Sequence, residues 1–337
     1  MKILLGSHAF LPMLGGIEVI SNVLAEEFVK AGHEVHLITQ TPGDGADAFP
    51  FQVTRQPSAG KVRELAQWSD VFFQNNISIQ TLLAALPVQR KIVIAYQTWI
   101  RRTDSKPSLL HWSKAQISRL IPRNVAISRA IADTIPGRSV LIPNPYDHHT
   151  YRPIEGITRD RDLIFVGRVV SDKGADLLLD ALGKLAVKGQ RPNLTIVGVG
   201  PEVEPLKAQA AVLGIAGQVH FAGPHRGEAL ARLMNQHRVL VVPSRWAEPF
   251  GIVALEGIGC GCAVIGSADG GLADAIGACG VTFPNGDVDA LANAVERLLG
   301  DPSAIPPLLA AAPEHLHRHR GDVIAGRYLE VFSELVR

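Results

Sequence analysis

Two carboxylates, Glu248 and Glu256, are separated by seven residues in one short stretch of the chain. The apolar run 239–242 before them predicts a buried strand, and the residues after Gly251 predict a helix. Glu256 then lies among apolar or small neighbours, where a charged group without a partner costs several kcal/mol. No basic residue lies within a helical turn of it in the sequence. We therefore expect its partner to be a ligand rich in hydroxyl groups, for which a carboxylate is a good acceptor.

A second polar element follows another apolar run and contains Gly167, Arg168 and Lys173. Ser171 or Asp172 can cap the helix that is expected to start there. A cation in or next to the first helical turn has the wrong sign for the helix dipole. An anion shared by Arg168, Lys173 and the free N–H groups of the helix would remove that conflict. A solvated lysine in a surface salt bridge is the alternative.

Paired glycines near the N-terminus, Gly15 and Gly16, precede a predicted helix with an apolar face. Glycines allow backbone N–H groups to approach a phosphate without a side chain in the way. An ordinary loop between strand and helix is the alternative, because a Gly-Gly pair by itself has little specificity.

Short apolar runs alternate with helical patterns along the chain, which predicts parallel sheets with helical crossovers. The runs are apolar throughout, as expected for sheets that are covered on both faces. The predicted strands are 2–5, 34–39, 71–74, 91–96, 124–127, 162–166, 193–197, 219–221, 239–242 and 263–266. The predicted helices are 17–31, 116–120, 130–134, 175–188, 202–213, 228–236, 252–259, 288–299 and 322–336.

A stretch rich in proline, residues 142–156, indicates a linker between two similar α/β halves. We expect an N-terminal domain at 1–150, a second domain at 151–320 and a C-terminal helix at 321–337 that packs back towards the N-terminal domain. Open parallel sheets bind ligands at the carboxyl ends of their strands. Two such sheets that face each other would place a ligand in the cleft between them.

The composition excludes several classes of protein. With 33 basic and 32 acidic residues the formal charge is +1, which argues against nucleic-acid binding by a charged face. No run of eighteen apolar residues predicts a membrane span. The odd and low cysteine count, Cys260, Cys262 and Cys279, favours a reducing compartment, and the C-x-C pair lacks further ligands for a metal. We expect a cytoplasmic protein.

Two other patterns are expected to be structural. Asp287 and Asp289 match the D-x-D pattern of metal-dependent enzymes, but a predicted helix follows directly, so we interpret them as a helix cap. His315, His317 and His319 lie beside two arginines and indicate a solvated basic segment.

Taken together, these elements resemble the retaining GT-B glycosyltransferases, specifically glycosyltransferase family 4. The resemblance covers most of the chain. It rests on Gly15-Gly16-Ile17-Glu18, on the element from Gly167-Arg168 to Lys173-Gly174, and on Glu248 to Glu256 with seven residues between them. It implies an α/β protein of GT-B architecture, with two Rossmann-like domains whose parallel sheets face an interdomain cleft.

The resemblance also implies roles for the motif residues. Arg168 and Lys173 would grip the diphosphate of a nucleotide-sugar and stabilise the charge on the leaving group, and Glu248 would bind hydroxyls of the donor sugar at the same catalytic centre. Glu256 would bind the ribose. The other donor-binding positions are Gly15, Gly16, Gly167, Phe250, Gly251 and Ile252. The family needs no metal or cofactor, and its donors are UDP- or GDP-sugars.

One position departs from the family pattern. Where relatives often have a histidine that faces the sugar, the strand 91–96 is followed by Gln97, which can form hydrogen bonds with a hydroxyl but cannot titrate. His8 and His111 are the other candidates on the acceptor side. Whether Gln97 replaces the histidine in function stays open.

The segment 108–121 mixes leucine, isoleucine and tryptophan with basic residues. A helix that rests on an anionic membrane has this composition, and so does a helix that packs on its own sheet, which we favour. The membrane alternative would place the protein at the inner face of the membrane.

The sequence therefore predicts a metal-independent, retaining glycosyltransferase that moves a sugar from a nucleotide-diphosphate-sugar to a hydroxyl of a glycan, a lipid-linked molecule or a small molecule. A nucleotide-sugar-binding sensor or scaffold without transfer activity is one alternative. A sugar-nucleotide epimerase of GT-B fold is another. The base, the sugar, the acceptor and the oligomeric state stay open.

Overall fold

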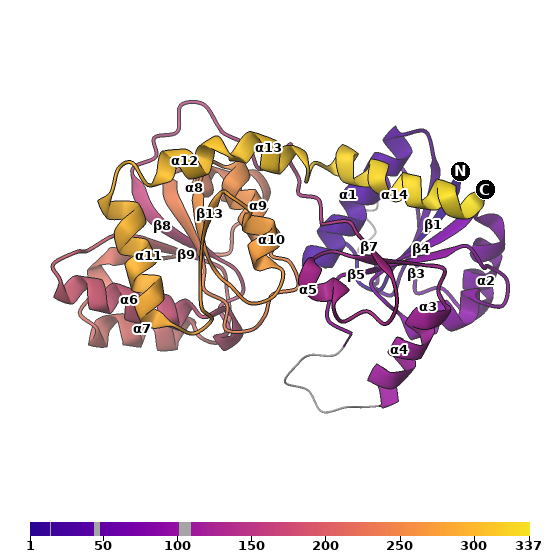
Figure 1. Ribbon diagram of the computed structural model, residues 1–337, viewed down its shortest axis with the longest axis horizontal. Helices are drawn as coiled ribbons and strands as arrows, with labels where there is room; N and C mark the ends of the chain where they lie inside the picture. The colour runs from indigo at the N-terminus through magenta and orange to yellow at the C-terminus, as the bar shows by residue number, and fades with distance from the viewer. Residues whose placement is uncertain (14, 44–47, 101–108) are drawn as a thin grey trace. The chain divides into compact units, whose positions relative to one another are not determined.

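The computed structural model describes residues 1–13, 15–43, 48–100 and 109–337, and the chain divides into two compact units (Figure 1). The first unit comprises Met1–Tyr146 and His319–Arg337, and the second comprises Asp147–Arg318. The sequence-based division lay between residues 150 and 151, with the C-terminal segment beginning at residue 321.

The first unit is built on a seven-stranded parallel sheet in the order β3-β2-β1-β4-β5-β6-β7. Its strands are β1 (Lys2–Ser7), β2 (Glu34–Thr39), β3 (Gln52–Arg55), β4 (Val71–Asn75), β5 (Ile92–Tyr96), β6 (Arg123–Ala126) and β7 (Ser139–Leu141). Every residue of β4 and β5 is buried, as expected for central strands covered on both faces. The strand order reverses between β1 and β4, so the switch point of this sheet lies at their carboxyl ends.

Helices of the first unit cover this sheet, and the C-terminal helix is one of them. They are α1 (Gly16–Lys30), α2 (Ala59–Trp68), α3 (Ile79–Ala85), α4 (Leu109–Leu120), α5 (Arg129–Ala132) and α14 (Gly321–Val336). Helix α14 runs beside α1 (Figure 1), and the Phe332 ring lies 5.5 Å from Phe28 and 5.4 Å from Phe73. These apolar contacts tie the end of the chain to the first unit.

The second unit has a six-stranded parallel sheet in the order β10-β9-β8-β11-β12-β13. Its strands are β8 (Arg161–Val166), β9 (Leu194–Val197), β10 (Val219–Gly223), β11 (His237–Val242), β12 (Ala263–Ser267) and β13 (Gly280–Phe283). The chain runs outward from β8 through β9 to β10, returns to β11 beside β8, and runs outward again. The switch point therefore lies at the carboxyl ends of β8 and β11.

Helices lie on both faces of this second sheet. Figure 1 shows α6, α7 and α11 on one side and α9 and α10 on the other. On the first side, Leu178, Leu182 and Leu185 repeat at helical spacing and pack in one core with Val239 and Val241. The helices are α6 (Ala175–Val187), α7 (Val203–Val212), α8 (Gly227–Asn235), α9 (Ile252–Gly259), α10 (Leu272–Ile276), α11 (Val288–Gly300), α12 (Ile305–Ala310) and α13 (Ala312–His317), with the short 3-10 helices η1 (Ser171–Lys173) and η2 (Ala216–Gln218).

The prediction of parallel α/β sheets is confirmed, and all ten predicted strands are present. Three strands that were not predicted, β3, β7 and β13, each lie at the edge of a sheet and are partly exposed. The helices α2, α3, α10, α12 and α13 were also not predicted.

Two predictions about helix caps have opposite outcomes. The cap at Asp287 is confirmed, because its carboxylate accepts a hydrogen bond from the backbone N–H of Ala290 at 2.9 Å. The cap of α6 by Ser171 or Asp172 is wrong. These residues form η1, and Gly174, with φ +67°, stands at the N-cap of α6 without a side-chain hydrogen bond.

The prediction of a solvated histidine segment is also wrong for two of its three residues. His315 and His319 are buried, while His317 is exposed. The buried rings are bonded to backbone carbonyl groups, His315 Nε2 to Ala275 at 2.7 Å and His319 Nδ1 to Asn144 at 3.1 Å. They therefore belong to the packing of the fold rather than to its solvated surface.

Candidate functional site

Two loops leave the switch point of the second unit side by side, because β8 and β11 are hydrogen-bonded neighbours. The loop after β8 carries Gly167, Arg168 and Lys173. The loop after β11 carries Glu248 and leads into α9, which carries Glu256. The order of the strands thus brings the donor-binding residues predicted in this half of the sequence to the carboxyl ends of two central strands, β8 and β11.

Lys173 and Glu248 contact each other directly. Nζ of Lys173 lies 2.6 Å from Oε1 of Glu248, and the hydroxyl of Ser244 donates to the same oxygen at 2.6 Å. The side chain of Glu248 is 8% exposed and that of Lys173 22% exposed, so the two partners satisfy a largely buried carboxylate. Nζ of Lys173 also lies 5.7 Å from the centre of the Trp246 ring, in a cation–π contact.

The backbone around this ion pair is packed so closely that two positions require glycine. At Gly174, where φ is +67°, a Cβ atom would lie 2.0 Å from the carbonyl oxygen of Pro243. At Gly270, where φ is +87°, it would lie 2.3 Å from the carbonyl oxygen of Glu248, which also accepts a hydrogen bond from Gly271 N–H at 2.6 Å. The two loops are therefore pressed together, and the backbone of Glu248 is held in place.

Gly167 and Arg168 differ in what they can offer a ligand. The backbone N–H of Gly167 donates to the carbonyl of Val197 at 3.0 Å and is already used. The side chain of Arg168 is exposed, and its guanidinium forms no hydrogen bond or ion pair within the described part of the chain. Arg168 can therefore turn toward an anion without breaking a contact.

Helix α9 begins at this edge with a left-handed glycine, Gly251, whose φ is +100°. The preceding Phe250 is 2% exposed and anchors the turn, and Ile252 opens the helix without a side-chain cap. The first N–H groups of a helix have no intrahelical partner, so they can bind an oxygen of a ligand.

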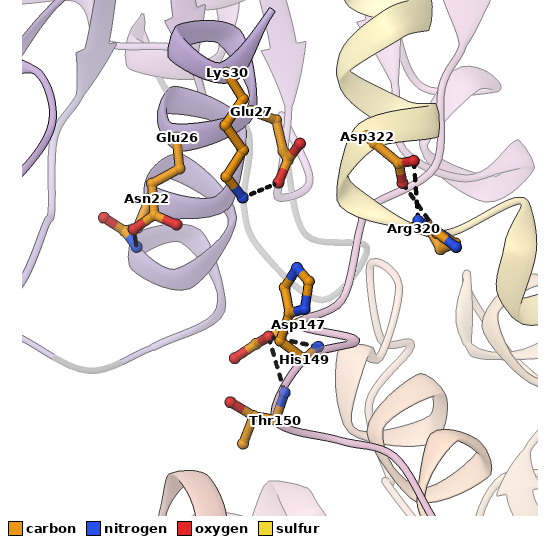
Figure 2. A network of polar contacts seen from close by, with 9 residues as sticks. All are labelled: Asn22, Glu26, Glu27, Lys30, Asp147, His149, Thr150, Arg320 and Asp322. Carbon is orange, nitrogen blue, oxygen red and sulfur yellow. Dashed lines mark hydrogen bonds and ion pairs between the residues drawn. The ribbon is translucent and has the colours of Figure 1, made fainter.

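Glu256 is half-buried on α9, and burial, followed by the negative charge of Asp147, raises its pKa to about 7. The carboxylate of Asp147 accepts hydrogen bonds from the backbone N–H groups of His149 at 3.1 Å and Thr150 at 3.2 Å (Figure 2). Burial and the charge of Glu256 in turn raise the pKa of the Tyr151 hydroxyl. No cation pairs with Glu256 among the residues that the structure describes, so its ionised form is costly unless a ligand satisfies it.

In the first unit, Gly15 and Gly16 stand exposed at the start of α1. The carboxylate of Glu18 is turned back over them, since a Cβ atom at Gly15 would lie 2.6 Å from its Oε2. Glu18 is buried and lies in the first helical turn, where a negative charge is favourable. The Glu18 carboxylate thus occupies the space over the start of α1, and a phosphate bound there would be repelled by its negative charge.

Gln97, the acceptor-side candidate after β5, is buried and bonded on both sides of its amide. Its Nε2 donates to Asn75 Oδ1 at 2.8 Å, and its Oε1 accepts from Asn144 Nδ2 at 2.8 Å. Asn75 Nδ2 donates in turn to the hydroxyl of Ser21 at 2.7 Å. The structure therefore places Gln97 in a hydrogen-bonded chain that links β4, β5 and α1 inside the first unit.

The two candidate histidines lie apart from this chain. His8 follows β1 with an exposed side chain, and its carbonyl accepts a hydrogen bond from the backbone N–H of Gln40 at 3.1 Å. His111 belongs to α4, and its side chain lies outside the described residues.

Comparison with known proteins finds a family model that matches the second unit. Residues 147–312 match the model of the family described as Glycosyl transferases group 1. A D-inositol 3-phosphate glycosyltransferase of Rhodococcus opacus is 30% identical over 207 residues, which cover 58% of this chain and 46% of the relative. A protein of the same name from Stackebrandtia nassauensis is 30% identical over 256 residues, or 71% of this chain and 55% of the relative. The chain thus spans about half the length of these relatives.

Solved structures extend the likeness to the whole chain. Anabaena Alr3699/HepE in complex with UDP has a TM-score of 0.84 and 20% identity, over 99% of this chain and all of that one. The sucrose-phosphate synthase of Thermosynechococcus elongatus has a TM-score of 0.80 and 20% identity, over 99% of this chain and 98% of that one. At this identity the likeness establishes the fold, and the two parallel-sheet α/β units are those of the GT-B architecture.

Several residues of the site were not predicted from the sequence. Asn75 ends β4, Ser244 is the second residue after β11, and Asp147 lies in the linker 142–156. A polar residue at or just beyond the carboxyl end of a strand was the available signal for the first two. Arg245 was also missed, and its side chain joins the loop after β11 to Asp176 in the first turn of α6.

Proposed function

We propose that the protein is a retaining, metal-independent glycosyltransferase of family 4. It moves a sugar from a UDP- or GDP-sugar to a hydroxyl of a glycan, a lipid-linked molecule or a small molecule. The second unit holds the nucleotide-sugar, and the first unit binds the acceptor. The observation that carries the proposal is the contact of Lys173 with Glu248 at the switch point of the second sheet, beside the exposed Arg168.

In this proposal Lys173 and Arg168 hold the diphosphate, Glu248 accepts hydrogen bonds from the sugar, and Glu256 accepts them from the ribose. The bond between the anomeric carbon and the diphosphate oxygen breaks, and the acceptor oxygen bonds to the same face of that carbon. The acceptor proton passes to an oxygen of the departing phosphate. The contact of Lys173 with Glu248 supports this assignment, because a cation bonded to the carboxylate that binds the sugar would lie close to the diphosphate attached to that sugar.

The names of the similar proteins support the donor class. Alr3699/HepE has been solved in complex with UDP and with UDP-glucose. The curated relatives are named for transfer to inositol 3-phosphate, a molecule whose acceptor groups are hydroxyls. We extend to this chain the use of a nucleotide-sugar and a hydroxyl acceptor.

Two measurements test the proposal. Thermal unfolding with UDP, GDP and their sugars should show one nucleotide that raises Tm, because a ligand at about 100 times its Kd adds about 2.7 kcal/mol. Donor consumption is then measured with a panel of acceptors, with EDTA present and absent, and the product anomer is read by NMR. A protein that no nucleotide stabilises refutes the proposal. Loss of turnover in EDTA would refute metal independence, and an inverted anomer would refute retention.

A sensor or scaffold that binds the donor without transfer is the second candidate. It is favoured by the buried amide of Gln97, which is bonded to Asn75 and Asn144 and cannot act as an acid or a base near neutral pH. Binding of a nucleotide-sugar without hydrolysis or transfer to any acceptor would establish it.

A cytoplasmic location with peripheral membrane contact is also part of the proposal. No helix among the described residues is both long enough and apolar enough to cross a bilayer. Helix α4 exposes Trp112 and Leu120 beside Arg119, a combination that suits an anionic surface. Sedimentation with anionic and with neutral vesicles tests the contact, and Trp112→Ser should weaken only the anionic case. Equal sedimentation of the two proteins with anionic vesicles would contradict it.

A further inference from the structure

Lys173 and Glu248 are 75 residues apart, and each lies on a loop beyond the end of a strand. Strand pairing fixes where these loops begin, but it does not fix the position of one side chain relative to the other. In the proposed function both side chains bind one donor, so an error of about 1 Å between them would cost up to about 100-fold in rate. Something beyond the sheet must hold the two loops together.

Arg245 makes that connection at three points. Its two terminal nitrogens form a bidentate ion pair with both carboxylate oxygens of Asp176, in the first turn of α6. Its Nη1 also donates to the carbonyl of Ser171 at 3.3 Å, and its backbone N–H donates to the carbonyl of Asp172 at 2.9 Å. Arg245 is thus bonded to residues on both sides of Lys173 in the sequence.

Arg245 also lies between two residues of the second loop that contact the Lys173–Glu248 ion pair. Ser244, which donates to Glu248, precedes it, and Trp246, whose ring lies under the Lys173 cation, follows it. A movement of Arg245 would therefore move the hydroxyl that donates to Glu248 and the ring that contacts Lys173. The close approach of Gly174 to the second loop leaves little room for a different packing.

The geometry points to Arg245 and Asp176 as positioning residues that hold the loop of Lys173 and the loop of Glu248 as one donor-binding surface. This inference rests on the proposed function. The bidentate pair fixes direction as well as distance, which a lysine cannot do. Its side chains are 39% and 36% exposed, and exposed pairs contribute little to global stability. The effect of the pair is therefore on local geometry.

Removal of the pair should lower kcat/KM for the donor strongly and should change the stability of the protein little. Arg245→Ala and Arg245→Lys should each lower kcat/KM by about tenfold or more, with little change in Tm. Because the two residues act as one pair, Arg245→Ala combined with Asp176→Ala should cost no more than Arg245→Ala alone. The exchanged pair, Arg245→Asp with Asp176→Arg, should recover part of the loss.

The control is Lys184→Ala. Lys184 forms an exposed ion pair with Asp289 that also joins two elements of the second unit, α6 and α11, and this pair does not touch the loops. It should leave kcat/KM unchanged. If Arg245→Ala had the same kcat/KM as Lys184→Ala, or if the two single changes were additive, the positioning role would be overturned.

A measurement without substrate separates this inference from the proposed function. Hydrogen exchange of the backbone amides in residues 170–174 and 244–250 should become faster in Arg245→Ala and should stay unchanged in Lys184→Ala. Faster exchange in a protein that binds no nucleotide would support the coupling of the loops while the proposed function fails. Unchanged exchange would overturn the coupling even in an active enzyme.

Discussion

Replacement of Glu256 by glutamine should make the protein more stable, and the gain should depend on pH. In the folded chain the pKa of Glu256 is raised from 4.5 to about 7, first by burial and then by the charge of Asp147. The folded state therefore holds the proton more tightly than the unfolded state. The contribution of Glu256 to the free energy of unfolding is therefore fully present below about pH 4.5, is lost as the pH rises from 4.5 to about 7, and does not change further above that.

The magnitude follows from the same two values. One pKa unit corresponds to about 1.4 kcal/mol, so the ionised Glu256 costs the folded state about 3 kcal/mol. Glutamine has nearly the same shape and no charge. The difference in unfolding free energy between Glu256→Gln and the wild type should therefore rise from near zero at low pH to about 3 kcal/mol above pH 7.

Urea unfolding at pH values from about 5 to about 9 measures this difference. Glu204→Gln is the control, because Glu204 is an exposed carboxylate on α7 that forms an ion pair with the neighbouring Lys207. Its stability difference from the wild type should not change over the range. A difference for Glu256→Gln that is equally flat would refute the reasoning. If the ribose binds to Glu256, the same variant should also bind nucleotide more weakly, so that stability and function oppose each other at this residue.

Four other substitutions test separate parts of the structure. Lys173→Ala and Arg168→Ala should each lower kcat by about 100-fold through loss of charge stabilisation at the diphosphate, and near-normal turnover in steady-state assays would contradict their assignment. Gly174→Ala should lower the free energy of unfolding in urea by about 2 kcal/mol or more, because the added Cβ would lie 2.0 Å from a carbonyl oxygen. Gly189→Ala is the control: its φ is similar but the space around it is open, so it should cost about 1 kcal/mol. Equal losses in the two glycine variants would show that the close approach is not what matters. Gln97→Leu should lower Tm, since it leaves the two buried amides bonded to Gln97 with unmade hydrogen bonds, and an unchanged Tm would argue against the buried chain.

The sequence by itself determined the alternation of strands and helices, because continuous apolar runs and helical spacing report burial residue by residue. It predicted β2 and α9 with the bounds that the structure has. It did not predict the edge strands β3, β7 and β13, whose partial exposure removes the apolar pattern that marks a central strand. It also singled out Lys173, Glu248 and Glu256 in the second unit, because a charge beside apolar residues or at the start of a helix stands out in a sequence. It did not single out Ser244 or Arg245.

The tertiary structure decided which of those polar residues meet. The order of the strands, which no local pattern encodes, puts β8 beside β11 and so brings Lys173 to Glu248. The order of the strands also brings Arg245 to Asp176. In the first unit it brings Gln97 to Asn75, so that the Gln97 amide is buried in a hydrogen bond instead of lying on an open surface. A sequence reports what each residue requires, but a contact between residues some seventy positions apart depends on the path of the backbone between them.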